Sequence, residues 1–137
     1  MAVISEIIRA EADNTLSFGN YTVADKQKSN DFKLNGHTYK VKTYNELTRL
    51  ECDDKMLLET VPGTAIHNLN DSNGSLEFAA EGSGDTQFTV GLEPDLEYNI
   101  FVDGEFVGMA ISSLSGKINF GIELREDFSP RIKIAKV

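Results

Sequence analysis

The second half of the chain alternates apolar and polar residues almost without interruption, and no other feature constrains the fold as strongly. Leu76, Phe78 and Val90 belong to runs in which every second residue is apolar. Asp103-Gly104 separates two further apolar runs and favours a two-residue hairpin turn, because Asp and Gly tolerate positive φ. Successive side chains of a strand point to opposite faces of its sheet. The period of two therefore predicts an all-β protein with one buried and one hydrated face per sheet.

The spacing of these runs predicts the architecture of the C-terminal part. Short strands separated by turn residues at intervals of this kind are typical of an immunoglobulin-like β-sandwich, which we expect over residues 73–137. The chain lacks the Cys–Trp–Cys signature of immunoglobulin domains, so this prediction rests on spacing alone. The expected strands are 75–81, 86–92, 97–102, 106–111, 117–124 and 131–136.

The N-terminal part predicts a lobe of antiparallel hairpins over residues 1–72. Asn35-Gly36 is a second primed-turn signal, and residues 53–55 mark a third hairpin with a slightly longer loop. The polar stretch 24–30 is expected to be a loop. Residues 3–12 fit either a strand or a helix, and the strand is favoured because the segment is short and a strand-like run follows.

Five turn-forming residues in a row, Asn70 to Gly74, predict a boundary between the two lobes. The first lobe would then comprise residues 1–72 and the second residues 73–137. Whether the two lobes share one hydrophobic core is left open by the pattern.

The charge of the chain excludes several classes of partner. Among 137 residues, 22 are acidic and 13 are Lys or Arg, which gives a formal net charge of -9. Such a surface repels nucleic acid and anionic lipid, so neither a nucleic-acid partner nor a membrane is expected. The first residues lack the basic region of a secretion signal, and a single cysteine, Cys52, suits a reducing compartment. These features predict a cytoplasmic protein.

No motif predicts a catalytic residue, a metal or a cofactor. His37 and His67 lie in different expected hairpins, and neither has a Cys or another His close in sequence, as a zinc site with regular ligand spacing would require. Asp53 and Asp54 follow Cys52 and should raise the pKa of its thiol, which opposes a nucleophilic role.

Glycan binding is the alternative that the aromatic residues allow. Sugars stack on flat aromatic faces, but the chain has no Trp, and most Phe residues occupy the apolar phase of expected strands. Tyr21 and Tyr44 fall outside that pattern most clearly. They are the candidate ligand-binding residues.

Six segments of the chain carry a resemblance to a known family: 5–12, 16–21, 39–43, 61–64, 92–94 and 98–104. Together they resemble a family of short bacterial proteins labelled endosialidase or endosialidase-like. The resemblance spans nearly the whole chain and implies hydrolysis of sialic-acid glycans, but it carries no residue with an assigned chemical role. Enzymes of that kind are large propellers that clamp a carboxylate with several arginines, whereas this chain is too short for a propeller.

The leading hypothesis is a non-catalytic all-β module that acts by self-assembly as a homo-oligomer or by binding a protein partner. Many short strands leave sheet edges that must be paired, covered or charged. We expect such edges to be protected from unwanted strand pairing by the charges of Lys40, Lys42, Lys133 and Lys136. A glycan- or ligand-binding accessory module is the alternative, and the hydrolase implied by the family label is the third hypothesis.

Overall fold

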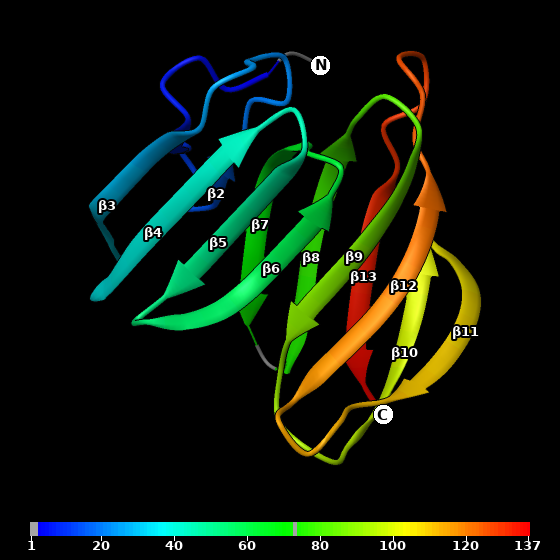
Figure 1. Cartoon of the computed structure of the whole chain (residues 1–137). Coiled ribbons are helices and arrows are strands. Elements are labelled where there is room, and N and C mark those ends of the chain that lie inside the picture. Colours follow the sequence, from blue (N-terminus) through cyan, green and yellow to red (C-terminus); the bar gives the residue numbers. More distant parts are fainter. Residues whose placement is uncertain (1–2, 73) are drawn as a thin grey trace.

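The computed structural model describes residues 3–72 and 74–137, in which every regular element is a β-strand (Figure 1). The strands form two antiparallel sheets, which confirms the all-β prediction. The seven-stranded sheet runs, from edge to edge, β1 (Ile8–Ala10), β2 (Leu16–Phe18), β7 (Ala65–Ser72), β8 (Ser75–Glu81), β13 (Arg131–Lys136), β10 (Glu97–Val102) and β11 (Glu105–Ile111). The six-stranded sheet runs β12 (Lys117–Glu123), β9 (Asp85–Gly91), β6 (Lys55–Val61), β5 (Leu47–Cys52), β4 (His37–Tyr44) and β3 (Gln27–Leu34).

Two-residue turns with positive φ close three of the hairpins. Asn35-Gly36 joins β3 to β4 with φ of 53° and 80°, and Asp103-Gly104 joins β10 to β11 with φ of 51° and 83°, as the sequence predicts. Asp53-Asp54 joins β5 to β6 with φ of 51° and 66°. This third turn is one residue shorter than expected, because Asp is one of the few residues besides Gly and Asn that accept the left-handed region.

One local prediction differs from the structure, and a second is confirmed in part. The stretch 24–30 was expected to be a loop, but β3 begins at Gln27. An edge strand needs backbone pairing with one neighbour and little burial, so polar residues are compatible with it. In the segment 3–12, only residues 8–10 form a strand, and the described part contains no helix.

The two expected lobes share both sheets and one core. The expected boundary falls in the connection between β7 and β8, which pair with each other, while Asn73 itself lies outside the described residues. Strands from each side of this connection occur in both sheets. A run of turn residues marks a reversal of the chain, and such a reversal looks the same in a hairpin as in a linker. The immunoglobulin-like arrangement of residues 73–137 stays a prediction.

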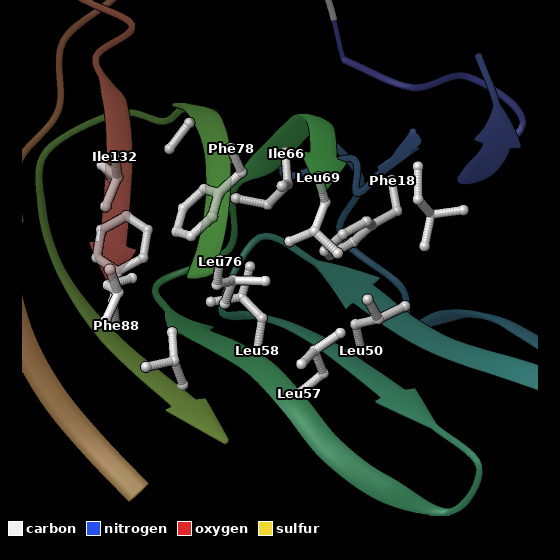
Figure 2. Packing of buried hydrophobic residues seen from close by; sticks show 14 of the residues in the cluster. Phe18, Leu50, Leu57, Leu58, Ile66, Leu69, Leu76, Phe78, Phe88 and Ile132 are labelled. Atoms are coloured by element: carbon white, nitrogen blue, oxygen red, sulfur yellow. The ribbon is translucent and has the colours of Figure 1, made fainter. Parts of the chain in front are cut away.

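Phenylalanine side chains join the two sheets at the centre of the core (Figure 2). Phe88 of β9 stacks on Phe78 of β8 in the opposite sheet, with 6.0 Å between ring centroids and 29° between planes. On its other side Phe88 lies parallel to Phe120 of β12 at 5.2 Å. Phe78 and Phe88 are fully buried. Aromatic pairs of this kind add to the gain from apolar burial, so Phe88 anchors the packing of the sheets.

A buried network of hydrogen-bonded threonines joins the strands β4 and β5 of the six-stranded sheet to two connections between the sheets. These are the connection from β2 to β3 and the connection from β6 to β7. The Thr48 hydroxyl donates to the Thr64 carbonyl at 2.9 Å and accepts from the Thr64 backbone N–H at 3.0 Å. It also lies 2.8 Å from the Thr43 hydroxyl, which accepts from the Asn20 backbone N–H. All three threonines are buried, so each of these polar groups depends on its protein partners.

We expect Phe88→Ala to lower the free energy of unfolding by about 3–5 kcal/mol, because it removes a fully buried ring that contacts both sheets. Denaturant unfolding followed by circular dichroism and by tyrosine fluorescence measures this loss. Val137→Ala, at an exposed position, is the control and should change the value by less than about 0.5 kcal/mol. Two separate transitions, one per predicted lobe, would contradict a shared core.

We expect Thr48→Val to lower the free energy of unfolding by about 1–3 kcal/mol, because it leaves the N–H and carbonyl of Thr64 buried without this partner. Thr48→Ser keeps the hydroxyl and should retain most of the stability. The midpoint of urea unfolding compares the two variants. Equal midpoints for Val and Ser would show that the hydroxyl network contributes nothing.

Candidate functional site

The strand β11 forms one edge of the seven-stranded sheet (Figure 1). It exposes several large apolar side chains. Phe106, Val107, Met109 and Ile111 are 60%, 59%, 56% and 62% exposed, and we call these four residues the β11 edge. The strand contains neither Lys nor Arg, and Glu105 is its one charged residue. Neighbouring apolar side chains on an exposed edge are typical of an interaction surface.

The pairing of β11 with β10 determines which part of the strand is regular. Gly108 to Ile111 pair in continuous register with Glu97 to Ile100. The register shifts between Gly108 and Phe106, which leaves Val107 as a bulge, and beyond it Phe106 packs edge-on against Phe101 at 6.0 Å. A bulge bends a strand locally. Residues 108–111 are therefore the stretch best suited to pair with a further strand.

The loop that follows β11 extends this apolar surface. Leu114 is 89% exposed, and Leu96 of the facing loop is partly exposed. Ser112 holds the two loops together, since its N–H donates to the Leu96 carbonyl at 2.9 Å and its hydroxyl to the Glu93 carbonyl at 2.7 Å. The surface beyond the strand thus has a defined shape.

The other sheet edges carry charges or are short. The edge strand β3 contains Lys28, Asp31 and Lys33, and β12 begins with Lys117 and ends with Glu123. The fourth edge, β1, has three residues. These are common protections against unwanted strand pairing. Within residues 3–72 and 74–137, β11 is the edge strand without a basic residue.

The lysines expected to guard edges lie on interior strands. Lys40 and Lys42 belong to β4, which lies between β5 and β3, while Lys133 and Lys136 belong to β13, which lies between β8 and β10. The prediction was wrong because alternation identifies a strand but gives no information on its neighbours in the sheet.

The two candidate ligand-binding tyrosines both lie close to Gly63. A Cβ at Gly63 would lie 2.0 Å from the Tyr44 carbonyl oxygen and 3.3 Å from the Tyr21 Cβ. Their side chains have different surroundings. Partial burial, and then the charges of Glu81 and Glu126, raise the pKa of Tyr21. Lys26 lies over the Tyr44 ring, with its Nζ 5.6 Å from the centroid. The ligand-binding role of this pair stays a prediction.

The four arginines form separate local ion pairs. Such pairs compete with the joint clamping of a substrate carboxylate that the hydrolase hypothesis requires. In the described residues no two arginines share a carboxylate. The pairs are Arg9 with Glu6 and Glu11, Arg49 with Glu51 and Glu59, Arg125 with Glu123 and Asp127, and Arg131 with Glu77.

A second cluster of chemically active side chains lies where two hairpin turns meet at the end of the six-stranded sheet. His37 Nδ1 is 2.6 Å from Asp53 Oδ2, and Cys52 Sγ is 3.9 Å from the same oxygen. The backbone N–H of Thr38 donates to Asp53 Oδ1 at 3.0 Å. We call His37, Cys52 and Asp53 the hairpin-end cluster.

Sequence reasoning missed this cluster because it searched for ligands close to each histidine in sequence. The two turn signals, Asn35-Gly36 and Asp53-Asp54, would have located it. The strands β4 and β5 are antiparallel, with Tyr39 opposite Cys52, so the start of β4 and the end of β5 lie at the same end of the sheet. Residues next to the two turns must therefore approach each other.

The hairpin-end cluster borders a cavity of about 190 Å³ between the two sheets. His37, Tyr39 and Cys52 line it from one sheet, and Leu69 and Asp71 of β7 line it from the other. Much of the Asp71 residue is exposed, but its carboxyl group is partly shielded from water, and this desolvation raises the pKa of the carboxyl. Burial also raises the pKa of the Cys52 thiol, and the charge of Asp53 adds to the rise, in the direction that the sequence predicts. The Thr38 N–H and His37 lower the pKa of Asp53.

Tyr39 should titrate well above an ordinary tyrosine, because burial and the neighbouring Cys52 raise its pKa to about 12. The folded state then holds the phenol proton more tightly than the unfolded state, so the contribution of Tyr39 to stability falls as pH rises from about 10 to about 12. A spectrophotometric pH titration should lose its step near pH 12 in Tyr39→Phe and keep it in Tyr44→Phe. Persistence of that step in Tyr39→Phe would contradict the assignment.

Comparison of the chain with protein-family models, curated proteins and solved structures finds no match in any of the three. The resemblance to endosialidase-like proteins therefore stays a prediction. No helix in the described part of the chain has the length and apolar character needed to cross a membrane. The cytoplasmic location also stays a prediction.

Proposed function

We propose that this protein is a non-catalytic all-β module that self-assembles by pairing the β11 edge of one copy with the β11 edge of another. The observation that carries the proposal is the combination on one strand of a free edge, exposed apolar side chains and no basic residue. The other three edges in the described residues are charged or short.

A second copy fits this surface because an antiparallel strand is complementary to itself. Two copies related by a two-fold axis at residues 108–111 would join their seven-stranded sheets into one continuous sheet, with the same residues buried on both sides. With the axis at Ala110, Met109 of each copy would lie opposite Ile111 of the other. Glu105 lies at the other end of the strand, beyond the bulge, and need not enter the pairing.

The net charge of each copy opposes the association of two copies, and this opposition depends on salt. Each copy carries a formal charge of -9, so two copies repel each other at low ionic strength. The pairing surface itself is apolar. Added salt should therefore strengthen the dimer by screening the repulsion, whereas an assembly held by ion pairs would weaken.

We expect Met109→Lys to weaken the dimer at least tenfold, because it would place one ammonium group from each copy in the apolar pairing region. Light scattering coupled to size-exclusion chromatography, over a wide range of protein concentration, measures the dissociation constant. Val61→Lys is the matched control, since Val61 is also exposed but lies on the interior strand β6. Both changes bring the net charge from -9 to -8, so a general charge effect would act equally on both variants.

A mass of 15.1 kDa at every concentration and salt level would overturn self-assembly. So would equal dimerisation of Met109→Lys and Val61→Lys, because the interface would then lie elsewhere. Such results would favour one of the alternatives, which are a glycan- or ligand-binding module that uses Tyr21 and Tyr44, a module that binds a different protein, and the hydrolase.

A further inference from the structure

We propose that the hairpin-end cluster, His37, Cys52 and Asp53, binds one divalent transition-metal ion, and that Zn²⁺ is the ion that fits it best. One imidazole nitrogen, one thiolate sulfur and one carboxylate oxygen are the three kinds of ligand that Zn²⁺ takes in proteins. The three donor atoms lie within 4.8 Å of one another. The site lies at the end of the hairpins β3–β4 and β5–β6, on the far side of the sandwich from β11, so the proposal is independent of the assembly (Figure 1).

The spacing of the donor atoms is close to that of a tetrahedral site. Bonds of about 2.0–2.3 Å at tetrahedral angles place a nitrogen and an oxygen ligand about 3.3 Å apart, and a sulfur and an oxygen about 3.6 Å apart. Here His37 Nδ1 and Asp53 Oδ2 are 2.6 Å apart, and Cys52 Sγ and Asp53 Oδ2 are 3.9 Å apart. To bind a metal ion, the nitrogen–oxygen distance must lengthen and the sulfur–oxygen distance must shorten, each by less than about 1 Å. His37 and Asp53 are both about half exposed, so their side chains have room for this movement.

The backbone around the cluster holds the ligands in place. The Thr38 N–H donates to Asp53 Oδ1 and leaves Oδ2 directed toward His37 and Cys52. A carboxylate oriented in this way by a neighbouring donor is a common feature of protein metal sites. Asp53 begins a tight turn at φ 51°, and Cys52 is paired in the sheet with Tyr39. Rigid strand ends of this kind reduce the entropy lost when an ion binds.

The surrounding charges favour a cation at this position. Asp71 lines the same cavity from the opposite sheet and adds a second carboxylate. With three protein ligands, a bound Zn²⁺ would have room for a fourth ligand, which water or an exogenous ligand could supply, as in other zinc sites with three protein ligands.

Cobalt(II) titration of the reduced protein tests the proposal. Co²⁺ accepts the same ligands as Zn²⁺ and gives a near-ultraviolet charge-transfer absorption when a thiolate binds it, which reports Cys52 directly. We expect this absorption to saturate at one Co²⁺ per chain and to disappear when Zn²⁺ is added. Cys52→Ser should abolish it. His37→Ala should weaken Zn²⁺ binding, measured by calorimetry, by at least tenfold.

Asp54→Asn is the matched control, because Asp54 is the next residue of the same turn and its carboxylate pairs with Lys40 instead. It should bind Co²⁺ and Zn²⁺ as tightly as the unmodified chain does, whereas Asp53→Asn should weaken the binding of both ions. Absence of the charge-transfer absorption in the unmodified protein would overturn the site. Unchanged Zn²⁺ affinity in both His37→Ala and Asp53→Asn would also overturn it, since Cys52 would then bind the ion without the cluster.

Discussion

The packing of the two sheets on a shared apolar interior is the constraint on which every other feature of the molecule depends. Phe88 lies between Phe78 of the facing sheet and Phe120 of its own, and the buried cluster around them draws residues from both halves of the chain. Neither sheet can bury its apolar face alone, so neither half of the chain should be stable alone. The threonine network around Thr48 adds polar contacts that define how the connections cross between the sheets.

This packing decides where function can lie. The inner faces of both sheets are used by the core, so the remaining sites are the sheet edges, the outer faces and the hairpin ends. The β11 edge and the hairpin-end cluster are two such places, on opposite sides of the sandwich (Figure 1). Each is positioned by regular strands rather than by long loops, which gives both a defined geometry. One offers backbone groups with apolar side chains, and the other offers three metal-binding side chains next to a cavity.

The sites were harder to predict than the strands. The alternation around Phe78 and Val90 and the turn signals at Asn35-Gly36 and Asp103-Gly104 identify strands and hairpins, because these depend on neighbours in sequence. The prediction that Lys40 and Lys133 protect sheet edges was wrong, because the order of the strands decides which of them lie at an edge. The approach of His37 to Cys52 follows from the register of β4 with β5, and a search limited to nearby residues could not find it.

The sequence by itself determined the all-β class, most strand positions, the hairpin turns and the negative net charge, since periodicity, turn chemistry and net charge are local or summed properties. The tertiary structure alone decided that strands from both halves interleave in two sheets, that β11 is left at an edge, and that two turns bring a histidine, a cysteine and an aspartate together. Hairpin pairing is encoded between adjacent residues, whereas strand order depends on which arrangement buries the apolar faces of all strands at once. That choice is made by the whole chain, and no single segment contains it.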